Sequence, residues 1–66
     1  MTVYVNGDAK EVPPGTTLAG LIEVLGLSSK RMAVERNRSI VAPDAYAETA
    51  LVDSDRLEII SFVGGG

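Results

Sequence analysis

The chain has 66 residues, of which 45% are hydrophobic and 23% charged, and its formal net charge is −3. This length fits one domain, and a domain of about 60 residues buries only ~60% of the surface of its unfolded chain, so its core is thin. The sequence contains no cysteine and no histidine, which excludes disulfides and thiolate metal sites and argues against a self-contained enzyme.

Charge and hydropathy narrow the class of protein further. Acidic and basic residues are interleaved, and no basic run lies beside aromatic residues, so we expect no nucleic-acid partner. No apolar stretch approaches the roughly 20 residues of a membrane span, so we expect no membrane partner. The first residues pass directly into an alternating segment without a charged and apolar leader, and we therefore expect a cytoplasmic protein.

The first segment of the chain predicts a β-hairpin. Residues 2–5 alternate apolar and polar side chains, and Asn6-Gly7 follows them. This dipeptide is the strongest short hairpin signal, because both residues tolerate a positive φ. Residues 9–12 are the expected return strand, and Pro13-Pro14-Gly15 ends it, since proline cannot donate to a strand ladder.

A short helix of roughly 8–10 residues is predicted next. Thr16 or Thr17 can cap it, and Gly26 lies where a left-handed C-terminal cap is needed. Gly20 lies inside the helix, where close packing against the sheet is one physical reason for a glycine. The apolar stripe of the helix has the spacing i, i+3, i+4 and i+7 and consists of Leu18, Leu21, Ile22 and Leu25.

The second half of the chain predicts short strands joined by turns. Its last strand, 56–62, places Leu57 and Ile59 on one face and Glu58, Ile60 and Phe62 on the other. The preceding segments are a strand at 32–35, a turn at Asn37-Arg38, a strand at 39–41, a helical turn or loop at 45–49, a short edge strand at 50–52 and a polar turn at 53–55.

Together these elements predict a two-layer α+β domain, in which one helix covers one face of a mixed sheet. The first and last strands are the most apolar segments of the chain, which fits a position at the centre of the sheet. Side-chain parity predicts a core of Val3, Val5, Leu21, Leu25, Leu57 and Ile59.

The chain ends in Gly64-Gly65-Gly66, directly after the apolar segment 57–63. Such glycines are consistent with a frayed terminus, since chain ends are often disordered. They also have the composition of a tether that can thread a narrow channel and place its carboxylate in another protein's active site. We therefore expect a domain at 1–63 and a flexible tail at 64–66.

Several motifs in this order resemble one family. They are Val5-Asn6-Gly7, the segments 14–18 and 33–37, Ile40-Val41 with Pro43 close behind, the segment 53–57 and the terminal 62–66. Together they resemble the ubiquitin-like β-grasp superfamily and, within it, the ThiS family of bacterial sulfur carriers in thiamin biosynthesis. Ser54 departs from the glycine that this family often has in the turn, and Ala42 is inserted where proline often follows the valine directly.

The resemblance implies a reaction cycle at Gly66. A ThiF-type enzyme would use ATP to adenylate the Gly66 carboxylate. A persulfide charged by a cysteine desulfurase would displace AMP, and the resulting thiocarboxylate would give its sulfur to thiazole synthase. Gly64 and Gly65 would thread into the partner, and Phe62, Val63 and Ile60 would dock against it, while the carrier itself would bind no cofactor or metal.

Other interpretations remain open from the sequence. The small subunit of molybdopterin synthase resembles this fold and tail, a protein modifier would join Gly66 to lysines, and a β-grasp binding module would carry its glycines incidentally. Ile60 is either covered by other segments or exposed for docking. For Asp53, Asp55 and Glu58 we expect a solvated turn and strand face rather than contacts with an activating enzyme.

Overall fold

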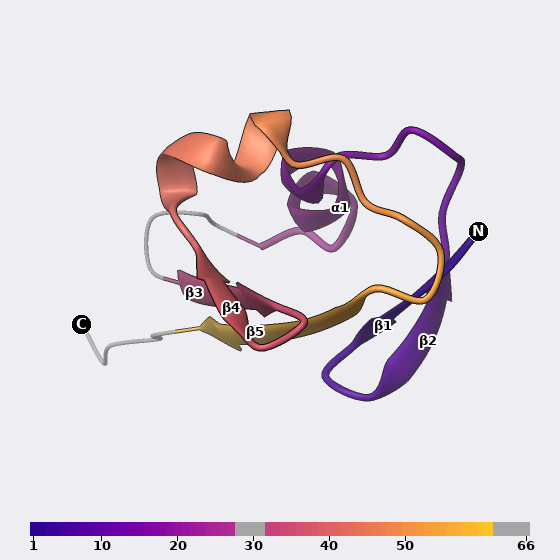
Figure 1. The fold of residues 1–66 in the computed structure, drawn as a ribbon, viewed down its shortest axis with the longest axis horizontal. Coiled ribbons are helices and arrows are strands. Elements are labelled where there is room, and N and C mark those ends of the chain that lie inside the picture. Colours follow the sequence, from indigo (N-terminus) through magenta and orange to yellow (C-terminus); the bar gives the residue numbers. More distant parts are fainter. Residues whose placement is uncertain (28–31, 62–66) are drawn as a thin grey trace.

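The computed structural model describes residues 1–27 and 32–61 of the chain. Its elements are β1 (Thr2–Val5), β2 (Asp8–Glu11), α1 (Leu18–Val24), β3 (Met32–Arg36), β4 (Ser39–Val41), the 3-10 helix η2 (Pro43–Glu48) and β5 (Arg56–Ser61). The strands form one five-stranded sheet in the order β2-β1-β5-β3-β4. Both α1 and η2 lie on the same side of this sheet (Figure 1). The predicted α+β architecture, a mixed sheet covered on one face by one main helix, is confirmed.

The first and last strands lie where their apolar composition predicts. β5 occupies the middle of the sheet and pairs in parallel with β1, whereas β3 pairs with it antiparallel on the other side. All other elements lie between β1 and β5 in the sequence, so these two neighbouring strands come from opposite ends of the described chain. The described chain ends at Ser61, the last residue of β5, in this central strand.

Both hairpin turns contain two consecutive residues with positive φ. These are Asn6 at 51° and Gly7 at 87°, then Asn37 at 50° and Arg38 at 73°. Such two-residue turns match the right-handed twist of the flanking strands. The first turn pairs Val5 with Asp8, so β2 begins one residue earlier than predicted.

The helix begins at the second of its two candidate caps. The Oγ1 of Thr17 accepts a hydrogen bond of 3.1 Å from the N–H of Gly20. The helix has 7 residues, shorter than expected, and Gly26 follows it with a φ of 73°. The suggested reason for Gly20 is wrong, because a Cβ there would meet Oγ1 of Thr17 at 3.4 Å and Cγ2 of Thr16 at 3.8 Å rather than the sheet.

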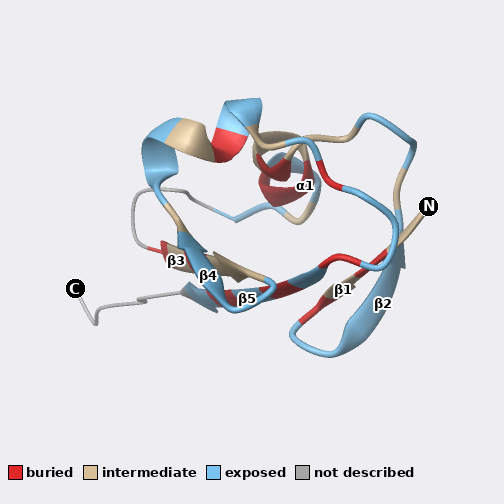
Figure 2. Ribbon diagram, in the orientation of Figure 1, coloured by how far each residue is buried: buried red, intermediate tan, exposed pale blue. Residues whose placement is uncertain are grey.

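The core lies between the sheet and the two helices (Figure 2). Of the predicted core residues, Leu25 is only partly buried, because it is the C-cap at the end of α1. The other predicted residues are buried, and further buried side chains come from both helices, from β3 and from the segment between η2 and β5. The buried hydrophobic residues are Val3, Val5, Leu18, Leu21, Ile22, Met32, Val34, Tyr46, Leu51, Leu57 and Ile59.

The predicted edge strand at 50–52 is wrong. Ala50 forms a single bridge with Thr17, and the segment pairs with the start of α1 instead of the sheet. The N–H of Leu18 donates to the carbonyl of Thr49, and the N–H of Leu51 donates to the carbonyl of Thr16, each at 2.9 Å. The first N–H groups of a helix have no partner within it, so this segment satisfies a donor that would otherwise be unpaired.

Candidate functional site

The end of β5 is the part of the described chain that leads directly to the glycine tail. On one side, β3 accompanies β5 as far as the pair Met32 and Ser61. On the other side, β1 pairs with β5 only through Tyr4 with Arg56 and Val5 with Leu57. The two flanking strands therefore support different lengths of β5.

Two asparagine side chains extend the support of β5, one from each hairpin turn. The N–H of Ile59 donates to Oδ1 of Asn6 at 2.8 Å, and Nδ2 of Asn6 donates back to the carbonyl of Ile59 at 3.1 Å. At the start of the strand, the N–H of Arg56 donates to Oδ1 of Asn37 at 3.0 Å. From the sequence both residues were assigned only a turn role, and these side-chain bonds were missed.

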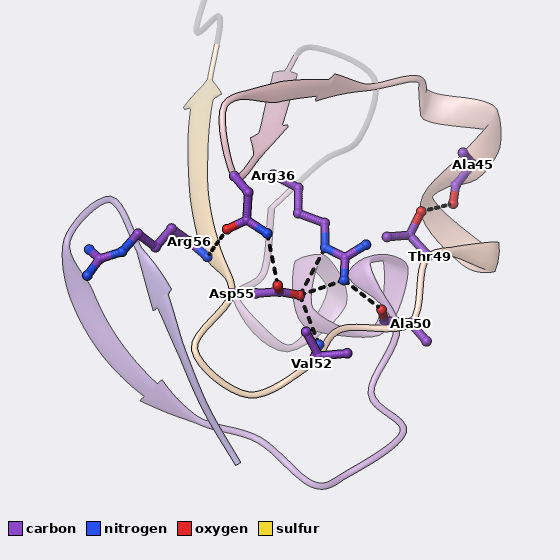
Figure 3. Close-up of polar contacts among 8 residues, drawn as sticks. Arg36, Ala45, Thr49, Ala50, Val52, Asp55 and Arg56 are labelled. Atoms are coloured by element: carbon purple, nitrogen blue, oxygen red, sulfur yellow. Dashed lines mark hydrogen bonds and ion pairs between the residues drawn. The ribbon is translucent and has the colours of Figure 1, made fainter.

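Asp55 forms a buried polar cluster beneath the start of β5 (Figure 3). Its Oδ2 accepts hydrogen bonds from Nε of Arg36 at 2.9 Å and from the N–H of Val52 at 2.8 Å, and it forms an ion pair with Nη2 of Arg36 at 2.9 Å. Its Oδ1 accepts a bond of 3.1 Å from Nδ2 of Asn37. The expectation of a solvated turn is therefore wrong for Asp55, which is 2% exposed, and right for Asp53 and Glu58, which are exposed.

The surroundings of Asp55 also decide its charge. Removal from water on its own raises the pKa of this carboxyl. The hydrogen bonds from Val52, Asn37 and Arg36, together with the charge of Arg36, outweigh that effect and hold the pKa of Asp55 below its ordinary value. Asp55 is thus an anion that ties the turn before β5 to the sheet.

The face of the sheet opposite the helices carries mixed side chains. Glu58 lies directly opposite Glu35 on β3, and Ile60 lies opposite Ala33. Ile60 is 52% exposed and Ile40 is 78% exposed, so two large apolar side chains of this face meet solvent. The question left open by the sequence is answered for Ile60, which is exposed beside the end of β5.

The other predicted site residues, Phe62, Val63, Gly64, Gly65 and Gly66, lie outside the described residues, as does the predicted boundary between domain and tail. Within residues 1–27 and 32–61, no group of three or more acidic side chains is placed to hold a metal ion. In the same part of the chain, every buried polar side-chain atom has a hydrogen-bond partner. The role of the described residues is therefore to hold β5 in place and to form the protein surface around its end.

Comparison with known proteins identifies the family. The model of the ThiS family matches residues 3–66, which is nearly the whole chain and includes the terminal glycines. The chain belongs to the ThiS family. Its sequence is 40% identical to the sulfur carrier protein ThiS of Bacillus subtilis, over 97% of this chain and 98% of that protein.

Longer proteins also contain a region similar to this ThiS-family chain. It is 38% identical to a thiazole synthase of Magnetococcus marinus and 41% identical to one of Paramagnetospirillum magneticum. Both matches cover all of this chain but only 20% of the relative, so the chain spans about a fifth of the length of these two proteins.

Solved structures agree with the fold. The crystal structure of a thiamine biosynthesis protein, ThiS, from Geobacter metallireducens superposes with a TM-score of 0.83 at 28% identity and full coverage of both chains. The described sheet and helix thus share the ubiquitin-like β-grasp arrangement of ThiS structures. Among the described residues, no helix has the length and apolar character needed to cross a membrane.

Proposed function

We propose that this chain is a sulfur carrier of thiamin biosynthesis and that its Gly66 carboxylate carries the sulfur as a thiocarboxylate. The observation that supports this most strongly is the ThiS family match, which extends through the terminal glycines. The carrier from Bacillus subtilis, similar over almost its full length, supports the same assignment. The proposal requires that the α-carboxylate of Gly66 is free in the mature protein.

Activation of Gly66 is the first step of the proposed cycle. A carboxylate is a poor electrophile, so a ThiF-type partner transfers AMP from ATP to the Gly66 carboxylate and releases pyrophosphate. ATP is consumed on the partner, and the carrier binds no cofactor of its own. The absence of cysteine and histidine fits this assignment of catalysis to the partner. The carrier contributes only the carboxylate that becomes the electrophile, and it needs no catalytic side chain. It is a protein cosubstrate rather than an enzyme.

Sulfur transfer is the second step. A persulfide, charged by a cysteine desulfurase, attacks the carbonyl carbon of Gly66 through its terminal sulfur and expels AMP. A second thiol then attacks the sulfur–sulfur bond of this acyl persulfide. The Gly66 thiocarboxylate leaves, and a disulfide remains on the sulfur donor, so the two electrons that cleave the bond come from that thiol.

The acceptor of the sulfur is thiazole synthase in this proposal. The thiazole synthases of Magnetococcus marinus and Paramagnetospirillum magneticum contain a region similar to this chain, which supports a functional link between the two. Tethering the sulfur to a folded domain presents it to the acceptor at a high effective concentration. The glycine tail, with no side chains, suits entry into the narrow sites of both enzymes.

The intact mass of the protein, isolated from cells that contain the activating system, tests the proposal. We expect a species heavier by the difference between one sulfur and one oxygen atom, and its sulfur should react with thiol-directed alkylating reagents. A variant without Gly66 is the control, because its carboxylate is withdrawn by up to ~3.6 Å and should not be converted. A protein recovered only as an amide conjugate with other proteins contradicts the carrier and favours a protein modifier. A chain continuing beyond Gly66 contradicts the free carboxylate.

A further inference from the structure

The second half of β5 continues beyond the last residue of β1. Bonds from the N–H of Tyr4 to the carbonyl of Asp55, and from the N–H of Asn6 to the carbonyl of Leu57, each 2.8 Å, show that alternate residues of β5 face β1. By the same alternation, the N–H and carbonyl of Ile59 face that side as well. However, β1 ends at Val5, and the chain turns away at Asn6-Gly7. Ile59 therefore lies where the backbone ladder of β1 has stopped.

The carboxamide of Asn6 occupies this position in place of a strand. Its Oδ1 accepts from the N–H of Ile59 at 2.8 Å, and its Nδ2 donates to the carbonyl of Ile59 at 3.1 Å. A primary amide holds a donor and an acceptor in one plane, which are the two groups that a neighbouring strand residue offers. Only Ile60 and Ser61 separate the residue held in this way from Phe62.

We propose that Asn6 is a positioning residue for the glycine tail. Its carboxamide holds Ile59 on the side of β1, while β3 pairs with the other side of β5 as far as Ser61. The strand is thereby held on both sides close to its end, and this sets the direction in which it leaves the sheet. This inference rests on the proposed function, because it concerns delivery of Gly66 to a partner's active site. Alignment of the reacting groups controls the rate of such a transfer, and small misplacements reduce it strongly.

The requirements of the turn alone do not explain asparagine at this position. A φ of 51° is tolerated by glycine, asparagine and aspartate. Glycine would make the turn without either bond, and aspartate could accept from the N–H of Ile59 but could not donate to its carbonyl. Among these residues, only asparagine provides both the turn and the two bonds to β5.

Asn37 provides a matched control within the same chain. It also lies in a two-residue hairpin turn, with a φ of 50°, and its Oδ1 accepts from the N–H of Arg56 at 3.0 Å. Its Nδ2 donates to Asp55 rather than to the strand end. Asn37→Gly therefore removes comparable bonds at the start of β5, far along the strand from the tail.

The first measurement is amide hydrogen exchange by NMR, which needs no partner. Asn6→Gly should accelerate exchange at Ile59 by about tenfold or more, since it removes the acceptor of that N–H. Asn37→Gly should accelerate exchange at Arg56 and leave Ile59 protected. Asn6→Asp should protect Ile59 to an intermediate degree, because it keeps the acceptor alone.

The second measurement is ATP–pyrophosphate exchange with a ThiF-type enzyme, at temperatures where every variant is folded. The kcat/KM for the carrier should fall about five- to tenfold in Asn6→Gly and stay within about twofold of the parent in Asn37→Gly. The kcat/KM of Asn6→Asp should lie between those of Asn6→Gly and Asn37→Gly. If Asn6→Gly does not fold, Asn6→Asp replaces it in the comparison with Asn37→Gly. Melting temperatures of all variants show how much stability each change costs.

The outcomes separate the inference from the proposed function. If the parent supports exchange and Asn6→Gly reacts as well as the parent, or loses no more than Asn37→Gly, the positioning role is overturned. Unchanged protection of Ile59 in Asn6→Gly overturns it too, whatever the partner does. A parent that never supports pyrophosphate release refutes the proposed function itself, and the positioning role with it.

Discussion

At the scale of single residues, the ion pair of Asp55 and Arg36 is the main polar interaction of the described core. The carboxylate is 2% exposed, and every bond to it comes from a different part of the chain, namely β3, the turn after β3 and the segment before β5. Breaking a buried charged pair leaves the remaining groups without partners, and hydrogen bonds to charged groups contribute about 1.5–3 kcal/mol each. This one side chain therefore joins the segment before β5, which lies outside the strands, to β3 and the turn after it.

We predict that Asp55 makes the stability of the domain depend on acid. Because the folded state holds the pKa of Asp55 below its ordinary value of 3.8, the unfolded chain binds more protons between the two pKa values. The stabilisation is complete above the ordinary value and is lost as the pH falls through the folded pKa. Thermal melting from about pH 7 to about pH 2 should show this loss in the parent.

Two variants make the assignment specific. Asp55→Asn should lower the free energy of unfolding at neutral pH by ~1.5–3 kcal/mol and should flatten the acid branch of the curve. Asp8→Asn makes the same change of charge at an exposed position of β2 and should follow the parent at every pH. An equally steep acid branch in Asp55→Asn would place the responsible carboxylate elsewhere.

The sequence could not reveal this role of Asp55. Asp53-Ser54-Asp55 has the composition of a solvated turn, and that interpretation is correct for Asp53. Arg36 lies 19 residues away in the chain and meets Asp55 only because β3 and β5 are neighbours in the sheet. Local patterns contain no information on such a pair, whereas the Asn6-Gly7 turn, which depends on two adjacent residues, was predicted correctly.

At the scale of elements, β5 contributes buried side chains to the core and also leads directly to the C-terminal tail. Leu57 and Ile59 face the helices and are buried, while Glu58 and Ile60 face solvent on the opposite side. This alternation was predicted from sequence, because the period of two residues is set by strand geometry alone. Tyr46 and Leu51 were missed as core residues, because the segments that contain them have no such period.

We predict that Leu57→Ala strongly destabilises the domain. Leu57 is 1% exposed, and truncating a buried leucine costs ~2–5 kcal/mol, of the ~5–15 kcal/mol typical for a whole protein. The neighbouring exposed variant Glu58→Ala is the control and should change the free energy of unfolding by only about 0.5 kcal/mol. Urea denaturation of both variants measures the difference. Equal midpoints for the two would be incompatible with the observed orientation of β5.

At the scale of the whole molecule, the two faces of the sheet have separate roles. The helices cover one face and build the core (Figure 2). The opposite face presents Ile40 and Ile60 to solvent, close to Glu35 and Glu58 in the strand register. If Gly66 carries out the proposed chemistry, the exposed Ile60 close to the tail is a candidate docking residue. The family and the fold were predicted correctly from motifs spread over the chain, but a docking surface depends on a partner and stays a prediction.

The last prediction tests Ile60 and Phe62 as docking residues. Ile60→Thr keeps a β-branched side chain in the strand and should weaken binding to the ThiF-type enzyme and to thiazole synthase by about three- to tenfold. Phe62→Ala should weaken both by ~10–150-fold, because a larger apolar side chain is lost from the interface. Both partners are affected, since both must hold the same tail.

Val24→Thr is the matched control, because Val24 is 80% exposed at the end of α1, on the side of the sheet away from Ile60. This variant should bind both partners like the parent. Titration calorimetry gives the affinities. The melting temperatures of all three variants should stay close to that of the parent, because Val24 and Ile60 are exposed and Phe62 is predicted to lie at the surface. A normal affinity of Ile60→Thr, combined with a lowered melting temperature, would assign Ile60 to the stability of the sheet. Equal losses in Val24→Thr and Ile60→Thr would show that the partners approach from the helical side as well, and the outer face of the sheet would then lose its special role.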